Sequence, residues 1–133
     1  METHRTIDLP AVMITFLDGD VVHAHFKEGH VGERSDVEAM FEAVSRERNG
    51  RKFLLLVSVG QGSALTNEAR AFASGEESNR IIAADAIIVR DFGHQMSANA
   101  FVRYNRPGRP AQLFPDMDSA LKWLAQQHHL IDA

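Results

Sequence analysis

Phe53-Leu-Leu-Leu-Val-Ser-Val59 is a run of seven residues in which Ser58 is the one polar side chain. Its apolar residues do not alternate with polar ones, as they would in a strand that keeps one face in water. A continuous apolar run of this length is typical of a central strand that is covered on both faces. We therefore predict a central strand over Phe53–Val59, with Leu55 fully buried.

Upstream of this strand, two short apolar runs flank the turn Asp18-Gly-Asp20 and predict a β-hairpin. The first run is Val12–Leu17 and the second is Val21–Lys27. The second run alternates, so its residues are expected on two faces. Val22, Ala24 and Phe26 would face the core, and His23, His25 and Lys27 would point away from it.

Helical signals follow the hairpin and the central strand. Ser35-Asp-Val-Glu38 matches a capping box and opens an apolar stripe that ends at Asn49-Gly50. Thr66 is expected to cap a short helix through Ala73, and Ser74-Gly-Glu-Glu77 a second one to about Ile81.

The second half of the chain continues the alternation of strands and helices. We expect a buried strand over Ala84–Arg90, a helix over Gly93–Tyr104, an edge strand over Gln112–Phe114 and a last helix from Pro115-Asp116. The fold predicted is a single α/β domain over residues 1–133, with a mixed β-sheet, an N-terminal hairpin and four to five helices.

Composition narrows the class of protein. The 133 residues carry a net charge of −4, which argues against a general nucleic-acid binder. The absence of cysteine removes disulfides and thiolate chemistry. No signal-peptide pattern and no apolar stretch long enough to insert into a membrane is found, so a cytoplasmic location is expected.

Six segments of the second half match a known family pattern: Asn67-Glu-Ala-Arg70, Ala86-Ile-Ile-Val89, Asn99-Ala-Phe101, Asn105-Arg-Pro107, Pro110-Ala-Gln-Leu-Phe114 and Ala120-Leu-Lys-Trp-Leu124. With these segments the second half resembles small, uncharacterised bacterial STAS-like proteins. The order of elements over nearly the whole chain resembles the STAS family, the SpoIIAA-like fold of anti-sigma-factor antagonists and sulfate-transporter tails. This resemblance implies a non-enzymatic domain that binds a partner protein or a small ligand.

The loop after the central strand is the main candidate for a partner- or ligand-binding site. In antagonists that the chain resembles, this loop holds a phosphorylated serine preceded by aspartate, whereas Gly60–Thr66 here has no Asp-Ser pair. A rigid strand presents the loop, and its glycines let another molecule approach the backbone. The candidates are Gly60, Gly62, Ser63, Thr66 and Arg70, with Ser63 and Thr66 as phosphorylation candidates.

A second candidate surface is basic. Arg90, Arg103, Arg106 and Arg109 lie close together in an otherwise acidic chain. Arginine forks suit carboxylates or phosphates, so Arg103 and Arg106 are candidate binding residues. A solvated charged face is the interpretation we favour.

Three histidines raise the question of a metal. His23 and His25 share a strand face, with Glu28 and His30 nearby. A solvated sheet face is the favoured interpretation, and no cofactor or metal is expected. The leading hypothesis is a non-enzymatic regulatory or binding module that contacts a protein or a small ligand. A small-molecule or lipid pocket, a His-based metal enzyme and a homodimer stay open as alternatives.

Overall fold

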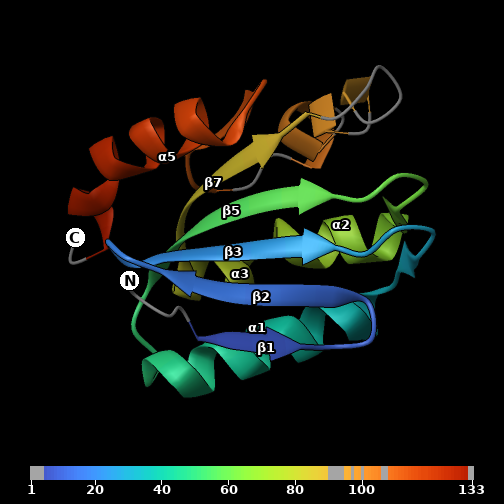
Figure 1. Cartoon of the computed structure of the whole chain (residues 1–133), viewed down its shortest axis with the longest axis horizontal. Helices are drawn as coiled ribbons and strands as arrows, with labels where there is room; N and C mark the ends of the chain where they lie inside the picture. Colours follow the sequence, from blue (N-terminus) through green and yellow to red (C-terminus); the bar gives the residue numbers. More distant parts are fainter. Residues whose placement is uncertain (1–4, 90–94, 97, 100, 106–107, 132–133) are drawn as a thin grey trace.

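A six-stranded mixed sheet runs through the molecule in the order β1-β2-β3-β5-β7-β8 (Figure 1). The first three strands are antiparallel neighbours, and β3, β5, β7 and β8 run parallel. The computed structural model describes residues 5–89, 95–96, 98–99, 101–105 and 108–131. The strands of the sheet are β1 (Thr6–Asp8), β2 (Val12–Leu17), β3 (Val21–Phe26), β5 (Phe53–Val59), β7 (Ile82–Ile88) and β8 (Ala111–Phe114).

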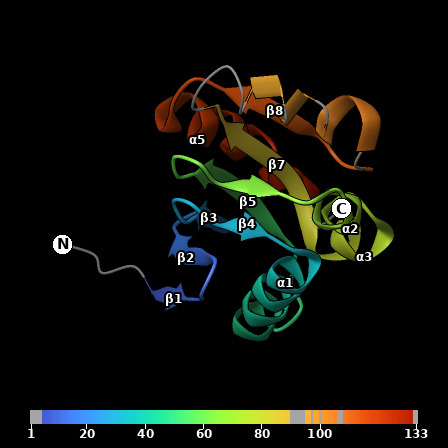
Figure 2. The same cartoon turned by 90° about the vertical axis from the view of Figure 1, so that its right-hand side faces the viewer.

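Helices cover the two faces of this sheet unequally (Figure 2). Three of them, α1 (Arg34–Arg48), α2 (Asn67–Ala73) and α3 (Glu76–Ile81), lie on one side, and α5 (Met117–Gln126) lies on the other. Among the described residues, no helix lies over the β2–β3 half of the face that carries α5 (Figure 1). No described helix combines the length and the apolar character needed to cross a bilayer.

The central strand is confirmed. Leu54 and Leu56 are fully buried in the cluster under α5, and Leu55 is buried in the cluster under α1. Each such side chain contributes roughly 2 kcal/mol by leaving water. The hairpin is confirmed as well, since Val12 pairs with Phe26 and Leu17 pairs with Val21.

Two predicted helix starts are wrong by one or two residues. Glu33, not Ser35, precedes the first turn of α1, and its backbone N–H donates to the Asp36 carboxylate at 2.8 Å. Gly75 precedes α3, while the Ser74 hydroxyl donates to the carbonyl of Ala71 at 3.0 Å. Several residues near each start can cap a helix, so the spacing alone does not select one.

Three short strands were not predicted. β1 adds an edge to the hairpin, and β4 (Val31–Gly32) pairs in parallel with β6 (Ala64–Leu65) as a separate two-stranded sheet. Strand β7 also begins two residues earlier than expected, at Ile82.

The predicted helix over Gly93–Tyr104 lies partly outside the described residues. Residues 95, 96, 98 and 99 are helical, and a π-helical turn follows at Phe101–Asn105. The chain then continues into the edge strand β8, as expected, and α5 begins after Asp116, whose carboxylate accepts from the Ser119 N–H at 2.8 Å. A short 3₁₀ turn, His128–Leu130, follows α5.

The central strand makes a direct prediction. Leu55→Asp should lower the free energy of unfolding by at least about 3 kcal/mol, because it places a carboxylate without a partner in the core. Leu55 also pairs in register with Asp85, so the new charge would face an existing one. Urea unfolding followed by circular dichroism measures the loss. Leu55→Met is the control and should cost less than about 1.5 kcal/mol; equal stability of the two variants would contradict this placement of the strand.

Candidate functional site

A cavity of about 360 Å³ lies between the sheet and the helices on the α1 side. Its walls come from the sheet, from α1 and α2, from the loop after β5 and from the π-helical turn. The size falls within the range of small-molecule pockets. The lining residues are Phe26, Val37, Met40, Phe41, Leu55, Val57, Val59, Gly60, Gly62, Ser63, Ala64, Leu65, Arg70, Ala73, Asp85, Ile87, Ala98, Phe101 and Arg109.

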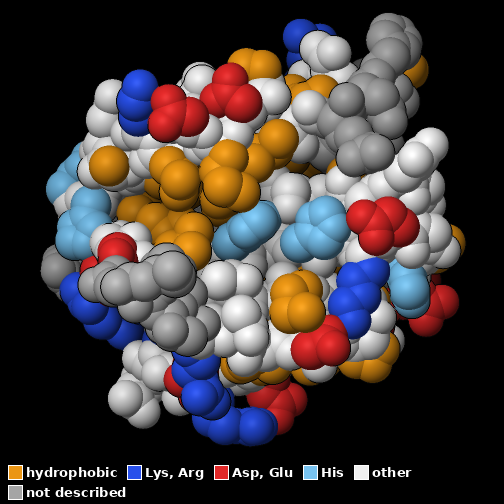
Figure 3. Space-filling view, viewed as in Figure 1, with side chains coloured by type: hydrophobic (Ala, Val, Ile, Leu, Met, Phe, Trp, Pro, Cys, Tyr) orange, Lys and Arg blue, Asp and Glu red, His pale blue; other side chains and the backbone are white. Residues whose placement is uncertain are grey.

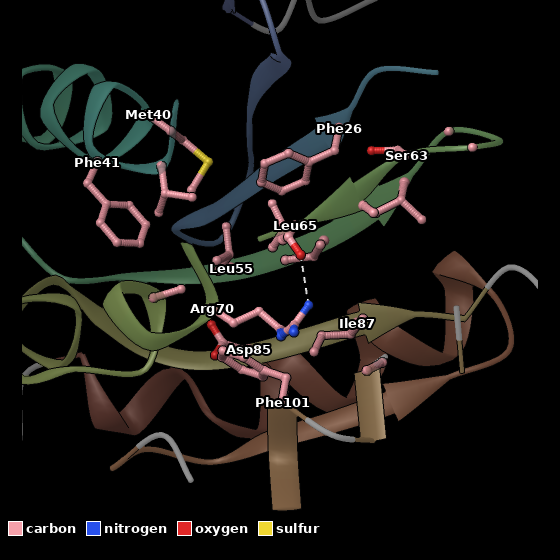
Figure 4. A pocket seen from close by; sticks show the side chains of 18 of the residues that line it. Phe26, Met40, Phe41, Leu55, Ser63, Leu65, Arg70, Asp85, Ile87 and Phe101 are labelled. Carbon is pink, nitrogen blue, oxygen red and sulfur yellow. Dashed lines mark hydrogen bonds between the residues drawn. The ribbon is translucent and has the colours of Figure 1, made fainter. Parts of the chain in front are cut away.

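Most of this lining is apolar, and its polar groups are few. Figure 4 shows Phe26 and Ser63 on one side of the cavity and Asp85 and Phe101 on the opposite side. An apolar chamber with a small number of placed polar groups is the usual architecture of a ligand site.

The polar group on the inner side of the cavity is a buried ion pair. Asp85 on β7 and Arg109, just before β8, have side chains that are only 3% and 4% exposed. Nε of Arg109 donates to Asp85 Oδ2 at 3.0 Å, and Nη2 forms an ion-pair contact with the same oxygen at 2.8 Å. Arg109 also donates to the Asn79 side chain at 2.6 Å and to the carbonyl of Ala73 at 2.7 Å.

Asp85 itself is incompletely bonded. Its Oδ1 is buried and has no hydrogen-bond partner within the described part of the chain. Burial raises the pKa of the Asp85 carboxyl, and Arg109 acts in the opposite direction through its charge and its hydrogen bonds. We take Asp85 as ionised, because Arg109 stays protonated and a neutral partner would leave its charge alone in the interior.

Arg70 braces α2 against the loop after β5. Its Nη1 donates to the carbonyl of Leu65 at 2.8 Å, which ties α2 to the short strand β6 (Figure 4). Its Nη2 donates to the Asn67 side chain. Arg70 is therefore both a lining residue and a brace for the loop that it follows.

The loop after β5 passes very close to the loop after β3. A Cβ on Gly60 would come within 2.6 Å of the backbone nitrogen of Glu28, so the crossing requires glycine. Gly62 has a φ of +77°, which favours glycine too. These two positions let residues 60–65 fold over the cavity and pair β6 with β4.

Four residues of the predicted binding loop and helix therefore line one cavity: Gly60, Gly62, Ser63 and Arg70. Thr66 instead caps α2, with its hydroxyl accepting from the Ala69 N–H at 3.1 Å. Arg103 is exposed on the π-helical turn, and the prediction for Arg106 lies outside the described residues. Whether any of these residues binds a partner, or whether Ser63 or Thr66 is phosphorylated, stays a prediction.

Sequence reasoning missed Asp85 and misplaced Arg109. Arg109 was assigned to a solvated basic face, but its side chain is buried against Asp85. One signal was available, because Asp85 is a charged residue inside the otherwise apolar run Ile82–Ile88. A carboxylate in a buried strand requires a partner, and the arginine-rich segment downstream could supply one.

The histidines occupy the other face of the sheet. His23 Nε2 and His25 Nδ1 each lie 2.8 Å from the Ser58 hydroxyl, and both rings are half-buried. They point away from the α1-side core as predicted, but they are less exposed than a solvated face would be. Figure 3 shows histidines in the middle of this face, beside apolar side chains near α5. Among the described residues, no group of three or more His, Asp or Glu side chains could hold a metal ion.

Comparison with known proteins identifies the fold of the chain and the family to which it belongs. The fold is SpoIIAA-like: an uncharacterised protein of the DUF3478 family with a SpoIIAA-like fold, from Shewanella loihica PV-4, superimposes with a TM-score of 0.56 at 17% identity. The match covers 93% of this chain and 97% of that one. Residues 15–128 match the family described as Domain of unknown function (DUF7793), so the chain belongs to that family. No curated protein matches it.

The histidine cluster predicts a pH dependence of stability. Burial lowers the pKa of His23 below its ordinary value of 6.5, and the neighbouring His25 lowers it further. Between the lowered value and 6.5 the unfolded chain binds more protons than the folded one, so the free energy of unfolding falls as the pH falls through this window.

His23→Gln should make this dependence shallower by less than one proton per molecule, measured by urea unfolding at several pH values below 6.5. His30→Gln is the control, because His30 is exposed and its Nδ1 lies within hydrogen-bond distance of the carbonyl of Glu28. An unchanged slope in His23→Gln would show that His23 is not the group responsible.

Proposed function

We propose that this chain is a non-enzymatic binding module that holds a small, largely apolar molecule in the cavity lined by Leu55, Ile87 and Phe101. The observation that supports the proposal most strongly is the cavity itself, about 360 Å³ in volume and mostly apolar. A concave space of this size with mostly apolar walls is typical of a small-molecule site. The presence of this apolar space beside the buried Asp85–Arg109 pair favours a bound small molecule.

The chemistry of the lining supports a binding role over a catalytic one. Ser63 is the one hydroxyl side chain among the described lining residues, and no histidine accompanies it. Nucleophilic catalysis needs a base within hydrogen-bond reach of the nucleophile. Asp85 is held by Arg109 on the inner side of the cavity, and Figure 4 shows Ser63 on the opposite side.

The loop over Gly60–Thr66 would link ligand binding to a partner. Gln61, Gly62 and Ala64 are exposed, and Gly62 and Ala64 also line the cavity. A molecule in the cavity would contact the same loop that a partner protein would contact from outside. The regulatory role that the resemblance to STAS domains implies would then operate through this loop.

Octanol is a suitable probe of the cavity, since it is apolar along its length and carries one polar end. It should bind with one molecule per chain and raise the melting temperature saturably, because a ligand of the folded state stabilises it in proportion to occupancy. Val57→Phe should abolish the effect by filling the cavity from β5. Isothermal titration calorimetry and thermal unfolding measure both quantities.

Leu17→Phe is the matched control, because Leu17 lines a separate apolar groove beside α5. This variant should bind octanol as the wild type does. If octanol fails to bind, or if Leu17→Phe rather than Val57→Phe abolishes binding, the cavity is not the ligand site.

A further inference from the structure

The inner wall of the cavity carries an acceptor that the described protein leaves unused. Asp85 Oδ1 has no hydrogen-bond partner, although Oδ2 of the same carboxylate accepts a hydrogen bond from Arg109 Nε and lies in ion-pair contact with Arg109 Nη2. Asp85 lies in the middle of β7, opposite Leu55 on one side and Ala111 on the other. Asp85 lines the cavity, but its Oδ1 is itself covered, so a molecule bound there reaches this oxygen only after a small movement of the neighbouring side chains.

A buried carboxylate oxygen without a donor is unfavourable, and hydrogen bonds to charged groups are stronger than those between neutral groups. Arg109 donates three of its five N–H groups, to Asp85 Oδ2, to Asn79 and to Ala73, and none of these hydrogen bonds reaches Oδ1. The missing donor must therefore come from a water molecule or from a ligand.

Charge restricts the kind of donor. The Asp85–Arg109 pair is neutral as a whole, and Arg70 also lines the cavity. Together with Arg70 these groups carry a net positive charge, which an ammonium group would increase, and a ligand carboxylate beside Oδ1 would face Asp85 directly. A neutral hydroxyl donor avoids both penalties.

We propose that the cavity selects neutral amphiphiles that carry a hydroxyl group, with the hydroxyl donating to Asp85 Oδ1 and the apolar body lying against Leu55, Ile87 and Phe101. This inference rests on the proposed function and adds the chemical class of the ligand. Asp85 is the specificity-determining residue, and Arg109 is a positioning residue that holds the carboxylate in place.

Two isomeric probes test the selection. Octanol and heptyl methyl ether contain the same atoms, but only octanol has a donor. Calorimetry on the wild-type protein should show octanol binding roughly tenfold more tightly, because the ether leaves the buried carboxylate oxygen without a donor. Octylammonium and octanoate should both bind more weakly than octanol.

Asp85→Asn gives a sharper test. Arg109 needs an acceptor, so the amide oxygen would turn toward Arg109 and the amide NH₂ would turn into the cavity as a donor. The preference for octanol over the ether should then disappear or reverse. Leu17→Phe, on the other face of the sheet, should keep the wild-type preference.

The outcomes separate this inference from the proposed function. Equal affinity of the wild type for octanol and the ether overturns the role of Asp85 while the cavity remains a ligand site. Absence of binding by every probe overturns both. The wild-type comparison decides the matter even if Asp85→Asn does not fold, and tighter binding of octanoate would assign recognition to Arg70 in place of Asp85.

Discussion

The ion pair between Asp85 and Arg109 is the interaction around which the second half of the structure is arranged. Removing two charges from water costs several kcal/mol per ion, and only well-placed partners offset that cost. Arg109 meets this condition by bonding to β7, to the end of α2 and to α3 at the same time. One guanidinium therefore fixes how the helices between β5 and β7 sit against the edge of the sheet.

The residues of β7 alternate between two environments, one on each face of the sheet. Ala84 and Ala86 lie in the cluster under α5, where their small side chains let the helix pack closely on the sheet. Asp85 and Ile87 line the cavity on the opposite face. One face of the strand is thus filled by a helix, and the other keeps space beside a charged pair.

The parts of the fold that could be predicted are those whose burial produces a pattern of apolar and polar residues along a short stretch of sequence. The apolar run Phe53–Val59 and the alternation in Val21–Lys27 each reflect burial of neighbouring residues, and the structure confirms both. The pairing of β4 with β6 could not be predicted, because two-residue strands carry no periodic signal. The loops that carry β4 and β6 also approach each other closely at Gly60 and Glu28, two residues from separate parts of the chain.

The prediction of the candidate site was limited in the same way, because it rested on local sequence. Sequence reasoning selected Gly60, Gly62, Ser63 and Arg70 from the position of their loop, and the structure brings them to one cavity. It did not select Asp85, whose partner Arg109 lies 24 residues away. The cluster of arginines near Arg109 in the sequence suggested a solvated charged surface. A local cluster of charges gives no information about a buried partner on another strand.

The most direct test of the proposed ligand site is a crystal structure of the wild-type protein after octanol has been soaked into the crystal. We expect one octanol molecule in the cavity, with its oxygen within hydrogen-bond distance of Asp85 Oδ1. Its chain should lie against Leu55, Ile87 and Phe101. Octanol bound in the groove beside α5, or in the cavity with its hydroxyl turned away from Asp85, would contradict this proposal.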